Sequence, residues 1–189
     1  MLSFRDVVVG LPALLALGAI AGSAGCSGKD PYRPGESVGA FHVTGKLVSS
    51  TCGTTPDPWA FDVKLRHDGN TLFWVQGDSP VSTVVDPTAH AVLKFSDVQT
   101  VRAADDKTKT PACTMARTDT VDVVLAPIGT ATAYPAVATS FSGTLSYQFT
   151  VADSTSYCDD QLTASGGDFA TLPCTVSYTL TATRTGDAK

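Results

Sequence analysis

The chain is poor in the residues that helices, membrane spans and nucleic-acid contacts require. Glu36 is the only glutamate, and 13 basic residues stand against 18 acidic ones, giving a net charge of −5. No apolar run reaches the roughly 18 to 20 residues that a spanning helix needs, and no basic patch offers phosphate contacts. A hydrophobic share of 43% still suffices for a core. We therefore expect a globular body with no nucleic-acid partner.

Side chains that usually build catalytic or metal sites are also scarce. His42, His67 and His90 show no H-x-H or H-x-x-x-H spacing, and the cysteines form no C-x-x-C pair. Residues 35–39 spell G-x-S-x-G, the nucleophile elbow, but the motif follows a proline-rich stretch and leads into a strand. We interpret the protein as non-enzymatic and expect no catalytic residue, no metal site and no cofactor.

An acidic segment between the last two expected strands is the remaining candidate for metal binding. It contains Asp153, Asp159, Asp160 and Asp168. Calcium needs several oxygens converging at about 2.3–2.6 Å, and the segment lacks EF-hand or nonapeptide spacing. We interpret it as a solvated loop.

The first 25 residues have the layout of an export signal. Arg5 precedes an apolar stretch, residues 7–21, that is too short to span a membrane and is followed by small residues. We expect residues 1–25 to be removed as a signal peptide. Residues 26–37, rich in proline, glycine and serine, then form a flexible tether, and residues 38–189 form one antiparallel β domain.

The residues around the expected cleavage point match a known family motif. Ser23-Ala24-Gly25-Cys26 resembles the lipobox of bacterial lipoproteins, whose cysteine is acylated and becomes the mature N-terminus, although leucine is usual where Ser23 stands. Five cysteines leave one unpaired, and a lipid on Cys26 leaves four for disulfides. An ordinary signal-peptidase site ending at Ala21, which would release a soluble protein, is the alternative.

The resemblance implies a place at the cell envelope and a membrane contact through a palmitate-bearing N-terminal anchor. Ser27 stands where an aspartate would mark inner-membrane retention in this family, which implies an outer-membrane lipoprotein facing the periplasm or the cell surface. With its strand-rich body, the chain resembles β-rich envelope lipoproteins of Gram-negative bacteria. We expect a lipid-anchored binding or structural module for a protein or glycan ligand. The alternative is an inhibitor or protective partner of a foreign hydrolase, a lysozyme or protease.

Alternating apolar and polar residues indicate strands along the whole body. The pattern is clear in residues 41–48, 59–66, 71–76, 140–151 and 174–183, and weaker in residues 81–85, 91–95, 113–118 and 121–125. Asp86-Pro87 could instead begin a short helix that runs to Lys94. The pattern predicts an all-β fold, a single antiparallel β-barrel or β-sandwich of about eight or nine strands with two disulfides.

The polar faces of the last two strands consist almost entirely of serine and threonine. If these strands are neighbours, their hydroxyls form a ladder suited to a glycan, a wall polymer or ordered water. The ordinary wet face of a barrel wall is the simpler interpretation.

The four body cysteines allow three disulfide connectivities. We expect Cys158 to pair with Cys174 across the loop between the last two strands, and by subtraction Cys52 to pair with Cys113. The alternative pairing of Cys52 with Cys174 would close the first strand against the last, which a barrel also permits.

Overall fold

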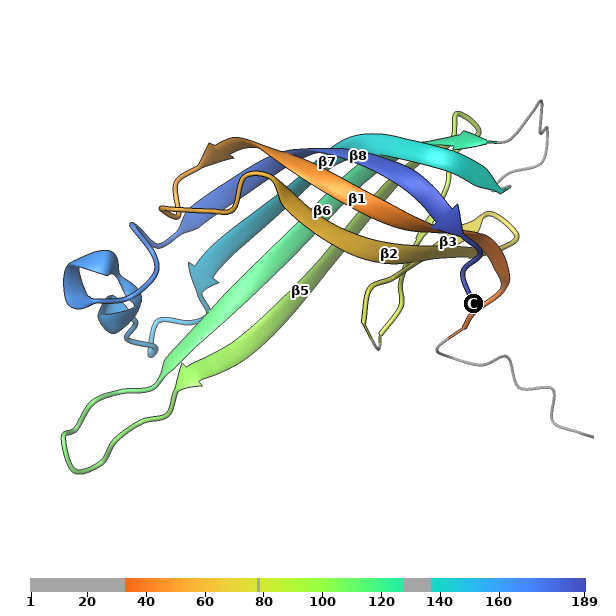
Figure 1. The fold of residues 1–189 in the computed structure, drawn as a ribbon. Helices are drawn as coiled ribbons and strands as arrows, with labels where there is room; N and C mark the ends of the chain where they lie inside the picture. The colour runs from red at the N-terminus through yellow and green to blue at the C-terminus, as the bar shows by residue number, and fades with distance from the viewer. Residues whose placement is uncertain (1–32, 78, 128–136) are drawn as a thin grey trace, which may run out of the picture.

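A computed structural model describes residues 33–77, 79–127 and 137–189, and nearly all of them belong to strands or the loops that join them (Figure 1). The strands are β1 (Glu36–Ser50), β2 (Trp59–Asp68), β3 (Thr71–Val75), β4 (Val81–Val84), β5 (His90–Arg102), β6 (Cys113–Pro127), β7 (Ala138–Val151) and β8 (Cys174–Gly186). Between β7 and β8 lie two short 3₁₀ helices, η1 (Asp159–Gln161) and η2 (Thr163–Ser165). The expected signal peptide, Cys26 and most of the tether lie outside the described residues.

The strands form one antiparallel sheet in the order β4-β3-β2-β1-β8-β7-β6-β5. Because β1 pairs with β8, the sheet curls round and brings its two edge strands, β4 and β5, toward each other. A tight turn at residues 85–89 joins them, but β4 has four residues and β5 has 13, so a seam stays open beside most of β5. The all-β prediction is confirmed, and its architecture is a nearly closed barrel of eight strands.

Three details differ from the sequence expectations. The two weak segments at residues 113–118 and 121–125 are one strand, β6, which explains why there are eight strands and not nine. The alternative helix after Asp86 is wrong, because the Asp86 carboxylate accepts hydrogen bonds from the backbone N–H of Thr88 and His90 and closes a turn before β5. Strand β1 begins at Glu36, so the last residues of the expected tether already belong to the barrel.

The interior is filled at one end of the barrel. Phe41 and Phe141 meet there with ring centroids 5.2 Å apart, and Trp74 packs against Phe141 at 5.7 Å. The side chains of Leu65 and Leu180 are fully buried beside them. This core lies between residues 38 and 188, so the described barrel carries its own hydrophobic core.

The first and last described segments of the chain meet at this filled end of the barrel. The Arg66 guanidinium donates hydrogen bonds to the carbonyls of Pro34, Gly35 and Ala188. Gly35 has a φ of 66°, and a Cβ there would lie 1.9 Å from the carbonyl oxygen of His67, so only glycine fits. The chain therefore enters and leaves the barrel at one end, as Figure 1 also shows.

The disulfides join Cys52 to Cys174 and Cys113 to Cys158, so the favoured pairing is wrong and the alternative is correct. Cys174 begins β8, and at that end β8 lies beside β1, as the hydrogen bond from the Thr51 N–H to the Thr175 carbonyl shows. Cys158 follows β7 by seven residues, and the loop has by then folded back onto the start of β6. Both disulfides lie at the end of the barrel opposite the filled core.

The hydroxyl ladder expected on the last two strands is present. Ser142 lies opposite Thr181, and the pairs Thr144–Thr179 and Ser146–Ser177 continue the same register on the outer face. These residues face solvent, in agreement with their alternation against buried Phe141, Leu145 and Leu180.

Candidate functional site

The inward face of β6 carries an ion pair. Cys113, Met115 and Val121 alternate along this face and are buried, and the same period places Arg117 and Asp119 between them. The Asp119 side chain is 3% exposed, whereas the Arg117 side chain is 48% exposed. Such a difference means that Arg117 borders an interior space that reaches solvent.

Asp119 holds the guanidinium by two hydrogen bonds. Arg117 Nε donates to Asp119 Oδ1 at 2.8 Å, and Nη2 donates to Oδ2 at 2.6 Å. Burial raises the pKa of the Asp119 carboxyl, an effect that Arg117 opposes, and the hydrogen bonds that Arg117 donates to Asp119 raise the pKa of Arg117. The pair is a fixed feature of the barrel interior, because each partner would be costly to leave alone.

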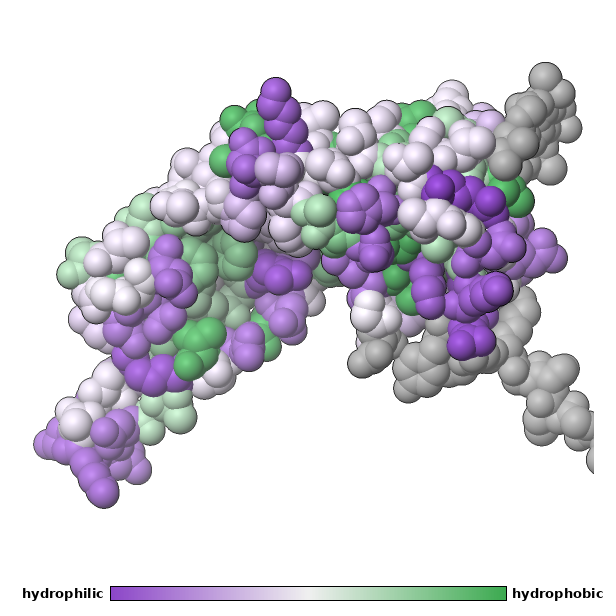
Figure 2. Space-filling model, viewed as in Figure 1, coloured by the Kyte–Doolittle hydropathy of each residue, from purple (hydrophilic) through white to green (hydrophobic). Residues whose placement is uncertain are grey.

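The space beside this pair is a cavity of about 640 Å³. Its walls come from six strands and include Trp59, Phe61, Trp74, Phe95 and Tyr147. Val81 of β4 and Asp97 of β5 stand on the two sides of the open seam, so the cavity reaches the surface between these strands. Figure 2 shows the molecule indented between the β5–β6 side and the β3–β4 side.

A second cavity of about 310 Å³ continues the first toward the disulfide end. Trp59, Arg117 and Tyr147 line both cavities. A third hollow of about 300 Å³ lies between β5, β6 and the β7–β8 loop, and Arg117 lines it too. Arg117 therefore stands where the three spaces meet.

Aromatic rings make up much of the wall. The Trp59 ring centroid lies 5.4 Å from that of Tyr147 and 5.6 Å from that of Tyr178. The ring centroids of Phe61 and Trp74 are 6.2 Å apart. Burial raises the pKa of the Tyr147 phenol, so this ring is neutral at physiological pH. Both tryptophans of the chain, Trp59 and Trp74, line the larger cavity.

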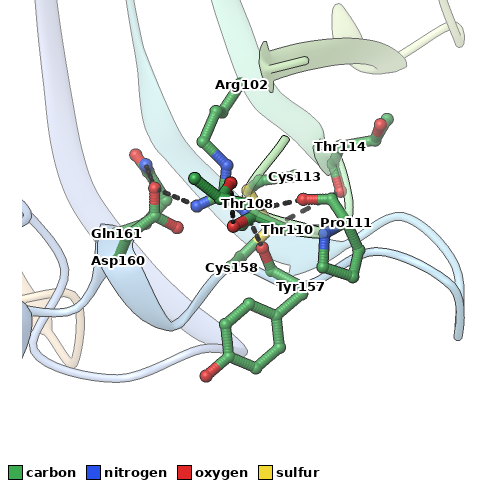
Figure 3. Close-up of polar contacts among 10 residues, drawn as sticks. All are labelled: Arg102, Thr108, Thr110, Pro111, Cys113, Thr114, Tyr157, Cys158, Asp160 and Gln161. Atoms are coloured by element: carbon green, nitrogen blue, oxygen red, sulfur yellow. Dashed lines mark hydrogen bonds and ion pairs between the residues drawn. A yellow bond between two sulfur atoms is a disulfide. The ribbon is translucent and has the colours of Figure 1, made fainter. Parts of the chain in front are cut away.

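The β7–β8 loop closes the disulfide end of the barrel. Phe169 of this loop packs against Phe149 with centroids 5.2 Å apart, and the Ala170 N–H donates to the Cys52 carbonyl at 2.8 Å. Arg102 holds the loop against the β5–β6 hairpin, with Nη1 2.6 Å from Asp160 Oδ2 and Nη2 donating to the Tyr157 carbonyl at 2.7 Å (Figure 3). The Cys113–Cys158 disulfide and the contacts of Arg102 thus hold the cavity wall in place at this end.

The histidines singled out in the sequence lie away from the cavity. His42 Nδ1 is 2.8 Å from Asp62 Oδ1, and His90 Nε2 is 2.7 Å from Asp122 Oδ1, both on the outer face. His67 lies 3.8 Å from the Glu36 carboxylate. They form carboxylate pairs on separate strands and do not converge.

The acidic loop and the serine motif have structural roles. Asp153 accepts hydrogen bonds from Thr155 and Ser156 and closes a turn, Asp160 pairs with Arg102, and Asp168 lines the smaller cavity. Within the described residues no three His, Cys, Asp or Glu side chains are grouped to hold a metal ion. Ser37 of the G-x-S-x-G motif accepts a hydrogen bond from the Ala188 N–H.

Arg117 and Asp119 are site residues that the sequence pattern did not predict. The pattern indicates two short strands, residues 113–118 and 121–125, and this division hides the fact that both charged residues lie on the same face as Met115 and Val121. Two opposite charges on the apolar face of one alternating segment are the signal that could have revealed them.

Comparisons with protein-family models, with curated proteins and with solved structures each found no match to this chain. In the described part of the chain, the 3₁₀ turns η1 and η2 are too short and too polar to cross a membrane.

Proposed function

We propose that this protein is a non-enzymatic binding module that takes one small organic ligand into its barrel and is held at the cell envelope by a lipid on Cys26. The observation that carries the proposal is the aromatic cavity of about 640 Å³ that opens at the β4–β5 seam. Ligand pockets commonly measure roughly 300–1,000 Å³ and combine apolar walls with a few polar groups. An eight-stranded barrel is also the size that can hold one small ligand.

The polar groups of the cavity favour binding over catalysis. Arg117 and Asp119 are hydrogen-bonded to each other, and none of the three histidines lines the cavity. The described lining residues therefore include no nucleophile hydrogen-bonded to a base, the arrangement that acyl or glycosyl transfer needs.

The envelope location is supported by the cysteines. Four of the five form two disulfides, which fits an oxidising compartment outside the cytoplasm and leaves Cys26 for acylation. The chain enters the barrel at the filled end, so a tether there would direct the disulfide end away from the membrane. This arrangement keeps the cavity region free for a ligand.

The binding experiment uses the mature chain without lipid, residues 27–189, and the neutral dye N-phenyl-1-naphthylamine. The dye becomes bright in apolar surroundings, so a saturable rise in its emission reports an apolar site, and variants of the cavity lining test whether that site is the cavity. We expect Tyr147→Leu to weaken dye binding by about three- to tenfold, because an aromatic contact contributes about 0.5–1.5 kcal/mol. Tyr157→Leu is the matched control, because Tyr157 is 49% exposed and stands outside the cavity. Absence of binding, or equal loss in both variants, would refute the proposal.

A second candidate, inhibition of a foreign hydrolase, is favoured by one observation. The β5–β6 hairpin extends well beyond the barrel end, and its tip at residues 103–109 is exposed (Figure 1). Lysozyme and trypsin assays with the mature chain separate the two functions. We expect no inhibition, and inhibition abolished by shortening the hairpin would favour the second function.

A further inference from the structure

The charges around the joined cavities limit the ligand further, on the premise that the proposed binding function is correct. We infer that the ligand is an organic cation, an ammonium group carried on an aromatic or aliphatic body. The inference rests on three features: the carboxylates at the cavity, the aromatic faces, and the engagement of the single arginine.

Acidic groups outnumber basic ones in the cavity lining. Among the described residues, the charged side chains that line the three spaces are Asp97, Asp119, Asp168 and Arg117, with a formal net charge of −2. Asp119 neutralises Arg117 through two hydrogen bonds. Asp97 and Asp168 remain as the two carboxylates available to a ligand.

In the described part of the chain, neither of these carboxylates accepts a hydrogen bond or forms a close ion pair. Asp97 interacts with Arg117 only through its charge, at longer range. Asp97 lies opposite Arg117 in the β5–β6 pair and stands at the open seam, where an entering ligand passes. Asp168 borders the smaller cavity next to Phe169.

The aromatic walls suit a cation as well. A cation over the face of tryptophan or tyrosine, within about 6 Å of the ring centroid, is attracted by the ring quadrupole. The cavity already contains one such contact, because the Arg117 guanidinium carbon lies 5.2 Å from the Tyr147 centroid. Trp59, which is only partly buried, lines the same cavity and offers its ring to a ligand.

An anionic ligand is disfavoured by the engagement of Arg117. Asp119 already balances the charge of Arg117, so an anionic ligand gains little net attraction at the guanidinium N–H groups that Asp119 leaves free. Asp97 and Asp168 would repel the same ligand. A neutral ligand avoids this repulsion but gains no charge interaction.

Three probes with one naphthalene body separate these cases: 1-naphthylmethylammonium, 1-naphthylmethanol and 1-naphthylacetate, titrated into the mature chain by calorimetry. We expect the ammonium to bind about three- to tenfold more tightly than the alcohol and the acetate to bind most weakly, given the usual strength of cation–π and exposed ion-pair contacts. Asp97→Asn should weaken ammonium binding by about two- to fivefold and leave alcohol binding unchanged. Asp106→Asn, on the exposed hairpin, is the matched control and should change neither.

The possible results point to different failures. If the alcohol or the acetate binds at least as tightly as the ammonium, the ligand is not a cation, although the barrel still binds small molecules. The same conclusion follows if Asp97→Asn and Asp106→Asn behave alike. If none of the three probes binds, the proposed function fails and the inference fails with it.

Discussion

At the scale of single residues, Arg117 and Asp119 place a charged pair inside an otherwise largely apolar barrel. They lie two positions apart on β6, so the strand period places both on the inward face, where Met115 and Val121 are buried. Their hydrogen bonds satisfy the buried carboxylate, and the guanidinium also rests against Tyr147. The pair keeps a polar lining in a part of the barrel that larger apolar side chains would otherwise fill.

This role predicts the effect of Arg117→Met on stability. Removing one partner from a fully buried pair costs about 3–5 kcal/mol. Because the guanidinium is 48% exposed, we expect a smaller loss in the free energy of unfolding, about 1–2 kcal/mol. The double variant, Arg117→Met with Asp119→Leu, should regain most of the lost free energy of unfolding, because it leaves no buried carboxylate unpaired. Urea unfolding measures both, and a double variant less stable than the single one would contradict this account.

His90 predicts a pH dependence of stability. Its hydrogen bond to Asp122, with Asp86 also nearby, raises the pKa of the imidazole above its ordinary value of 6.5. A raised folded-state pKa stabilises the protein below the unfolded pKa, and the stabilisation disappears as the pH rises through the folded pKa.

Thermal unfolding of wild type and His90→Gln between pH 5 and 9 measures this effect. The difference in stability should be largest at the acidic end of this range, below about pH 6, and should fall as the pH rises through the raised pKa of His90. A difference that grows toward alkaline pH would show that the imidazole is not held in its charged form.

At the scale of elements, strand pairing depends on close backbone contacts. Gly143 of β7 faces β6, and a Cβ added there would lie 2.0 Å from the Asp122 carbonyl oxygen. Gly143→Ala must push the two strands apart, and we expect a loss of about 1–3 kcal/mol in unfolding free energy. Gly186→Ala is the control, because nothing lies within 4 Å of its added Cβ. Equal stability of the two variants would show that the β6–β7 contact is not tight.

The two disulfides also connect elements, and they differ in the length of chain that they close. Cys52–Cys174 closes a separation of 122 residues and Cys113–Cys158 one of 45 residues. The chain-entropy relation gives about 5 and about 4 kcal/mol for loops of these lengths. Replacing Cys52 and Cys174 by serine should therefore destabilise the chain more than replacing Cys113 and Cys158. Urea unfolding of the two variants tests this order, and the reverse order would contradict the entropic explanation.

The sequence predicted the elements better than their partners. Alternation indicated a segment within each of the eight strands, because one face of a strand that lines a barrel is apolar, but it covered less than half of β5 and split β6 in two. The pairing of Cys158 was wrong, because the proximity of its partner depends on a loop that folds back onto β6, and no local pattern records such a return. Arg117 and Asp119 were missed where a charged pair interrupts the apolar period of β6.

At the scale of the whole molecule, the barrel divides into a filled half and a hollow half. The filled half holds Phe41, Leu65 and Leu180 and receives both ends of the chain through Arg66. The hollow half holds the aromatic cavity and is closed at its end by the disulfides and the β7–β8 loop. The aromatic cavity therefore borders the stabilising core, and Trp74 belongs to both, because it lines the cavity and packs against Phe141.

The measurement that tests this account most directly is nuclear magnetic resonance of the two indole N–H groups during titration with N-phenyl-1-naphthylamine. The chain has only two tryptophans, and both line the larger cavity. We predict that the signals of Trp59 and Trp74 both shift in a saturable way, while backbone signals of the hairpin tip at residues 103–109 stay in place. Unchanged indole signals, or shifts confined to the hairpin, would show that the barrel interior is not the binding site.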